Sequence, residues 1–156
     1  MFAASYPCLL LLLPAAVLAR DDFRTRRVGI AWLVGLGLAA VAAGWFCDGW
    51  RTMLLHAAVD ALLLGLLGVS LAGYLRLRRK RIGRSLGAGD AVFLLVITPL
   101  FSPEAYLRFL IAACALSLVW WAFLRPSRRS TIPFVGMAGL ALGGWVLLKI
   151  VRVWLS

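Results

Sequence analysis

The stretch MLLHAAVDALLLGLLGVSLAGYL at residues 53–75, followed at once by RLRRKRIGR at residues 76–84, decides the fold of this 156-residue chain. An apolar run of about 20 residues is long enough to cross the hydrocarbon core of a bilayer as a helix. A dense cluster of arginines behind such a run is typical of a loop at the membrane surface. Together the two stretches indicate a membrane-spanning helix that ends in a basic loop.

Five further apolar segments occur along the chain, at residues 2–19, 28–46, 91–101, 105–124 and 134–155. The segment at 91–101 is short, and extending it back to Leu86 places Asp90 inside it. The chain is 63% hydrophobic with a mean hydropathy of +0.96, whereas soluble domains are nearer half apolar. We therefore predict a single-domain, all-α integral membrane protein, a polytopic bundle of about six transmembrane helices over residues 1–156.

The basic residues predict how the bundle is oriented. Thirteen of the 17 lysines and arginines fall in the first, third and fifth loops, while the second loop offers Arg51 and the fourth holds Glu104. Because cytoplasmic loops are enriched in Lys and Arg, the odd loops are predicted to be cytoplasmic and both termini outside. The net charge of +11 is then a topology signal. The lipid bilayer is the expected partner of this surface, and no nucleic-acid partner is expected.

The first apolar segment has two interpretations. Val17-Leu18-Ala19 before Arg20 resembles a signal-peptidase site, which would remove the segment from the mature protein. However, no Lys or Arg precedes the apolar run, and Pro7 and Pro14 interrupt it. A retained first helix is therefore preferred.

Two acidic clusters fall on the predicted cytoplasmic side: Asp21-Asp22 after the first segment, and Asp90 in a Gly-Ala-Gly-Asp motif. Two carboxylates in a water-poor site share one proton, so that one can act as a base on water and the other as an acid. Gly87 and Gly89 would let a substrate backbone approach Asp90. The structural alternative makes Asp90 the N-cap of the fourth helix, with the glycines in its turn.

Three stretches resemble the type IV prepilin peptidase family, and they follow the family's order. Residues 22–28, Asp-Phe-Arg-Thr-Arg-Arg-Val, resemble its first aspartate motif. Residues 86–90 resemble its GxGD motif, and Thr-Ile-Pro-Phe at residues 131–134 resembles its C-terminal segment. The three matches extend from Asp22 to about Gly144, which is nearly the whole chain.

The resemblance implies an aspartic endopeptidase that removes the leader peptide of a prepilin or pilin-like protein at the cytoplasmic face of the bacterial inner membrane. By position, its catalytic pair would be Asp22 and Asp90, and the spacing to residues 26–28 favours Asp22 over Asp21. The length is similar to the family's short forms, which lack the methylating domain. No metal and no organic cofactor are expected.

The chain departs from the family at two places. Val28-Gly29 stands where the family usually has Ile-Pro, and Val92 stands where a Lys commonly follows the GxGD aspartate. The second departure is compatible with altered substrate recognition or with a loss of activity.

A second candidate site lies within the segment at 53–75. His56 and Asp60 are four residues apart and share one helix face, and ionisable residues inside a membrane are functional candidates by default. The pair can be interpreted as a proton relay or as two mutually satisfied buried groups. The alternative function is therefore a small membrane transporter, or a non-enzymatic assembly factor, that uses His56 and Asp60.

Overall fold

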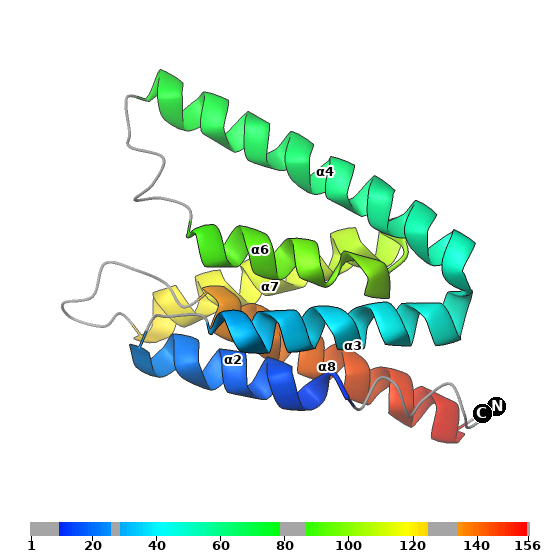
Figure 1. The fold of residues 1–156 in the computed structure, drawn as a ribbon. Coiled ribbons are helices and arrows are strands. Elements are labelled where there is room, and N and C mark those ends of the chain that lie inside the picture. The colour runs from blue at the N-terminus through cyan, green and yellow to red at the C-terminus, as the bar shows by residue number, and fades with distance from the viewer. Residues whose placement is uncertain (1–9, 26–28, 79–86, 125–133, 156) are drawn as a thin grey trace.

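The computed structural model describes residues 10–25, 29–78, 87–124 and 134–155, with side chains up to residue 151. Every regular element in these ranges is a helix (Figure 1). In chain order they are α2 (Leu12–Thr25), α3 (Ile30–Asp48), α4 (Trp50–Leu77), α6 (Ala88–Val96), the 3-10 helix η2 (Thr98–Leu100), α7 (Pro103–Leu124) and α8 (Phe134–Leu155). The prediction of an all-α protein is confirmed for this part of the chain.

Four of the helices, α3, α4, α7 and α8, are long and apolar enough to cross a membrane. The other two apolar segments also form helices, but α2 has 14 residues and α6 has 9, so neither counts as a span by length. The membrane character of the chain therefore rests on four helices. The prediction of six spans and the side on which the termini lie stay predictions.

The helices alternate in direction, so that each one begins at one end of the bundle and ends at the other. In Figure 1, α2, α4 and α7 end at the left, and α3, α6 and α8 begin there. Arg24 and Arg76 belong to the last turns of α2 and α4 at this end. Most of the predicted basic loops, at residues 26–28, 79–86 and 125–133, lie outside the described residues.

The first and last helices pack closely because small residues face each other. On α2, the buried residues Ala15, Leu18, Ala19 and Asp22 form a stripe at helical spacing. Opposite them, a Cβ atom at Gly139 would lie 3.2 Å from the carbonyl oxygen of Ala15 and from Cβ of Ala19. Small residues of this kind let two helix backbones approach in a membrane.

The helix α6, which begins within the Gly-Ala-Gly-Asp motif, ends early because of Pro99. Proline has no N–H to donate to the carbonyl four residues earlier, so the α-helix stops at Val96 and η2 follows. The hydroxyl of Thr98 instead donates to the carbonyl oxygen of Leu95 at 2.9 Å, and the hydroxyl of Tyr106 donates to that of Leu94 at 3.1 Å. The backbone polar groups at the break are thus satisfied inside the bundle, as a membrane protein requires.

The break packs against α3 and α4 at a point where only glycine fits. A Cβ atom at Gly44 would lie 2.3 Å from the carbonyl oxygen of Pro99 and 2.9 Å from Cγ of Met53. Gly44 therefore holds η2 and the start of α4 against α3. By contrast, Gly35 in the same helix has no atom within 4 Å of where its Cβ would be.

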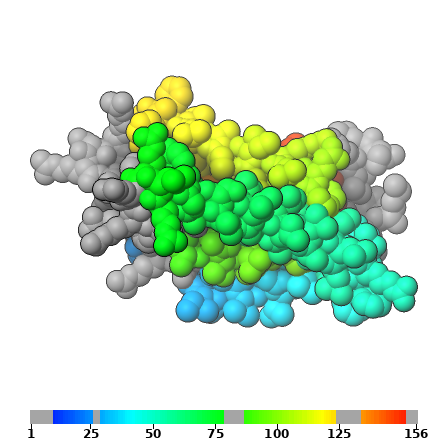
Figure 2. Space-filling view, turned by 90° about the horizontal axis from the view of Figure 1, so that it is seen from above, coloured from blue at the N-terminus to red at the C-terminus, as the bar shows by residue number. Residues whose placement is uncertain are grey.

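One side of α4 is not covered by the other described helices. In the view of Figure 2, α4 crosses the bundle obliquely, with α7 on one side and α3 on the other. Leu55, Leu62 and Val69 are seven residues apart and expose 68%, 70% and 72% of their surface. This spacing gives α4 one continuous apolar outer face, as expected for a helix in contact with lipid.

Gly44→Ala is expected to destabilise the fold by about 1–3 kcal/mol, because the new methyl group meets backbone that cannot move aside. Gly35→Ala is the matched control in the same helix and should leave stability nearly unchanged. The measurement is reversible unfolding of both variants in detergent. Equal stability of the two variants would contradict the close contact between α3 and η2.

Candidate active site

Asp22 lies at the junction of the first and last helices. Its side chain is 7% exposed, although it sits only three residues from the end of α2. Its Oδ2 accepts a hydrogen bond of 2.7 Å from the backbone N–H of Gly136, the third residue of α8. The first N–H groups of a helix have no partner within the helix, and the positive end of its dipole favours a carboxylate. Asp22 therefore caps α8 from another helix.

The neighbouring Asp21 has a different environment. It is half-buried, and its backbone carbonyl accepts a hydrogen bond of 3.0 Å from the hydroxyl of Thr25 within the same helix. Of the two adjacent aspartates, Asp22 is therefore the one that faces another element.

Asp90 lies in the first turn of α6, but not as its N-cap. Gly87 is the N-cap residue, and Asp90 is the third residue of the helix. The carboxylate of Asp90 turns back over Gly87 and is hydrogen-bonded to its backbone. A Cβ atom at Gly87 would lie 2.8 Å from Oδ2 of Asp90. The N-cap alternative is thus corrected: Asp90 supports the start of α6 from the third position, and Gly87 makes room for its carboxylate.

The structure brings Asp22 and Asp90 together electrostatically. Asp90 lies outside the four long apolar spans, and its pKa is raised to about 6. Burial is the largest cause, and the negative charge of Asp22 raises the pKa further, while the hydrogen bond from Gly87 opposes both. Two carboxylates from distant parts of the sequence therefore share one end of the bundle, as a catalytic pair requires.

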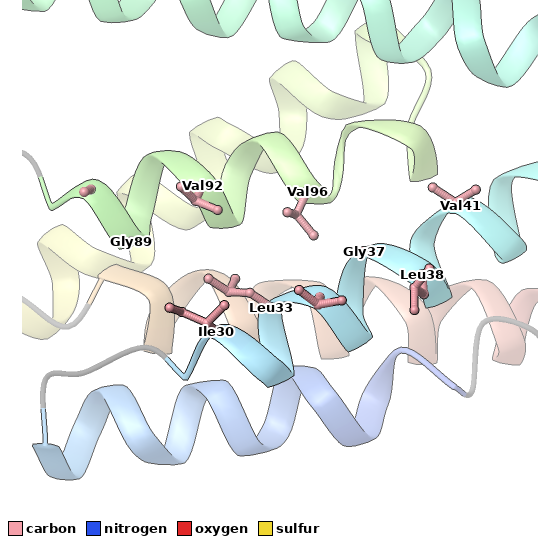
Figure 3. Close-up of a pocket in the computed structure, with 10 residues that line it drawn as sticks. Ile30, Leu33, Gly37, Leu38, Val41, Gly89, Val92 and Val96 are labelled. Atoms are coloured by element: carbon pink, nitrogen blue, oxygen red, sulfur yellow. The ribbon is translucent and has the colours of Figure 1, made fainter.

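An apolar groove runs along the bundle between α3 and α6, with a volume of about 550 Å³ (Figure 3). Gly89 and Val92 line it at the end where α6 begins, so the groove starts one residue from Asp90. Val92 is the residue at the position where the resembling family commonly has a Lys. Gly87 is exposed and is not part of the lining, so its role in admitting substrate stays a prediction. The remaining lining residues include Ile30, Leu33, Val34, Gly37, Leu38 and Val41 on α3.

His56 and Asp60 form a separate feature on α4. Asp60 is completely buried, and His56 is half-buried. Neither carboxylate oxygen of Asp60 has a hydrogen-bond partner, and the same is true of the buried Nδ1 of His56. The interpretation as two mutually satisfied groups is therefore wrong, because no hydrogen bond joins them. In contrast, the i,i+4 pair of Glu104 and Arg108 on α7 does form an ion pair.

Gly136 was not expected to be part of the site. Its sequence context, two residues into a helix that starts after Pro133, suggested only close packing. In the structure its N–H binds Asp22, and a Cβ atom there would lie 2.8 Å from the ring of Phe23. That ring in turn packs against Trp120 of α7, with centroids 5.3 Å apart. The feature of the sequence that could have identified this site residue is a glycine in the first turn of the last helix.

No protein-family model, curated protein or solved structure matches this chain. Within the described ranges, no three His, Cys, Asp or Glu side chains gather as a metal site would need.

Asp22→Asn is expected to lower the pKa of Asp90, because it removes the negative charge that opposes ionisation of Asp90. The amide oxygen of the new side chain can still accept the hydrogen bond from Gly136. Carbon-13 NMR of protein labelled at the aspartate carboxyl carbon, with Asp90→Asn for assignment, measures the titration. Asp21→Asn is the control and should leave the Asp90 titration in place. An Asp90 titration that is the same in Asp22→Asn as in the unmodified protein would contradict the coupling.

Proposed function

We propose that this protein is a membrane-embedded aspartic endopeptidase of the prepilin peptidase type. The observation that carries the proposal is the pairing of Asp22 and Asp90: burial raises the pKa of Asp90, the charge of Asp22 raises it further, and the pKa reaches about 6. An aspartate pair that shares one proton is the minimum chemistry of an aspartic protease. The order of the three resembling stretches along the chain supports the same class.

The environments of the two carboxylates favour different roles. Burial favours the protonated form of Asp90, while Asp22 faces the backbone N–H of Gly136 at the start of α8. In the proposed reaction, Asp22 accepts a proton from water as the water oxygen bonds to the peptide carbonyl carbon. Asp90 gives its proton to the departing amide nitrogen as the carbon–nitrogen bond breaks. After product release the pair again holds a single proton.

The groove between α3 and α6 supports a substrate that comes from the membrane. It is lined by apolar side chains and leads to Gly89, next to Asp90 (Figure 3). An apolar helix of the substrate would lie in the groove, with its scissile peptide bond at the Asp90 end. A prepilin or pilin-like protein, which carries one hydrophobic helix behind a leader peptide, has this form.

The proposed setting is the bacterial inner membrane, with six spans, cytoplasmic odd loops and both termini outside. The active end would then face the cytoplasm. Arg24 and Arg76 lie at this end and would repel a basic leader. Recognition would therefore depend on the residues around the cleaved bond rather than on loop charge.

Asp22→Asn and Asp90→Asn, made separately, should each lower leader cleavage by about 10²–10⁴-fold, because each removes one member of the acid–base pair. Cleavage of a candidate prepilin is followed in membranes, with insertion and stability measured in parallel. Asp21→Asn is the control and should retain activity. Normal cleavage by both inserted variants would refute the peptidase. Loss of activity only on substitution of His56 or Asp60 would instead favour a transporter.

Val34→Trp places a large side chain in the groove and should raise KM for the same substrate more than it lowers kcat, because it blocks binding without touching the carboxylates. Val69→Trp is the matched control, since Val69 lies on the exposed outer face of α4. Unchanged kinetics in Val34→Trp would exclude the groove as the binding path.

A further inference from the structure

Asp60 is a fully enclosed carboxyl group, and the proposed reaction does not use it. None of its surface is exposed, and neither of its carboxylate oxygens has a hydrogen-bond partner. It lies on the face of α4 that also carries the buried Met53, the face turned toward the rest of the bundle. An ionised carboxylate without a partner is very costly to bury, so the group is expected to be neutral instead.

A purely structural role does not account for this residue. A buried carboxyl group stabilises a fold when it is hydrogen-bonded or ion-paired, and an apolar residue of similar size is at least as stabilising. Asp60 makes no such bond to hold an element in place. Asp22, in contrast, caps α8, and the carboxylate of Asp90 supports the start of α6.

His56 is the ionisable side chain placed to exchange a proton with Asp60. His56 lies one helical turn earlier on the same face of α4. Its Nδ1 is buried and has no hydrogen-bond partner. Imidazole is the side chain that most readily gains and loses a proton near neutral pH.

The elements packed around Asp60 offer no competing proton acceptor in the part of the chain that is described. Tyr106 of α7 is close enough for the charge of Asp60 to act on it. However, the hydroxyl of Tyr106 donates a hydrogen bond to the carbonyl oxygen of Leu94. The hydroxyl of Thr98 on η2 donates to Leu95. The acids of α3 and α6, Asp48 and Asp90, lie at helix ends, and neither acts on the charge of Asp60.

We propose that Asp60 and His56 form a proton-binding pair inside the membrane, in which Asp60 holds a proton at neutral pH and exchanges it with Nδ1 of His56. In the exchange the O–H bond of Asp60 breaks and an N–H bond forms, which converts acid and imidazole into carboxylate and imidazolium. The proposal is independent of the Asp22–Asp90 pair.

The position of the pair gives the exchange a direction. His56 is nearer the start of α4 and half-exposed, whereas Asp60 is one turn deeper and fully enclosed. The start of α4 lies at the end of the bundle opposite to Asp22 and Asp90 (Figure 1). His56 therefore connects Asp60 to the membrane face that does not carry the proposed protease site.

Infrared spectroscopy of the full chain in lipid vesicles tests the proton on Asp60. The protein is labelled with carbon-13 at the aspartate carboxyl carbons and measured at neutral pH with Asp90→Asn as the background, so that the carboxyl group of Asp90 does not contribute to the spectrum. An isotope-sensitive carbonyl band of a protonated, non-hydrogen-bonded acid is expected. Asp60→Asn should remove it, and Asp48→Asn, which changes an exposed acid, should keep it. Absence of the band, or its persistence in Asp60→Asn, would overturn the proposal.

Asp60→Glu keeps the test valid if Asp60→Asn does not fold. The acid band should remain, but it should no longer respond to the aspartate label, because the carboxyl group now belongs to an unlabelled glutamate. A band that still shifts with the label would come from another aspartate and would contradict the assignment.

The role of His56 is tested by the rate at which the acid proton exchanges with heavy water. His56→Gln is expected to slow the exchange of the Asp60 band by at least about tenfold, because it removes the proton acceptor. Thr52→Ala, one turn earlier on α4, is the control and should leave the rate unchanged. An unchanged rate in His56→Gln would refute the exchange between the two residues.

Discussion

The hydrogen bond from the backbone of Gly136 to the carboxylate of Asp22 joins the first helix of the described chain to the last. It satisfies an N–H group at the start of α8 that the helix itself leaves unpaired. It also fixes the carboxylate in a buried position next to α6, where its charge reaches Asp90. One contact therefore links the start of α8 to the candidate site, at the end of the interface in which α2 packs on α8. Glycine suits position 136 because the ring of Phe23 occupies the space that a side chain would need.

The fold was predictable from the sequence wherever the signal was apolar length. Segments such as residues 53–75 and 105–124 became α4 and α7 with ends shifted by only a few residues. The short fourth segment was also recognisable as an apolar run at residues 91–101, where the structure has α6 and η2. What the sequence did not reveal is how the break is satisfied. The hydroxyls of Thr98 and Tyr106 do so through contacts that depend on how α6 and α7 pack.

The candidate site was predictable in its residues but not in its geometry. The charge pattern and the motif order pointed to Asp22 and Asp90, and their electrostatic coupling agrees with that choice. The local roles were not visible. Asp90 is the third residue of α6 rather than its N-cap. Gly87 has no side chain, and this leaves room for the carboxylate of Asp90. Likewise, spacing placed His56 and Asp60 on one helix face and left open whether they satisfy each other, because hydrogen bonding depends on side-chain directions that spacing does not specify.

The contact between Asp22 and Gly136 can form only late in the synthesis of the protein. The two residues are separated by 114 positions, so α2 has been synthesised long before its partner in α8. Until then, the carboxylate of Asp22 lacks the N–H group that holds it, and the face of α2 that receives Gly139 is open. The buried environment of Asp22 is completed only when the last helix inserts. A chain that stalls during synthesis before residue 136 would therefore present Asp22 without the N–H group of Gly136 that it binds in the folded protein.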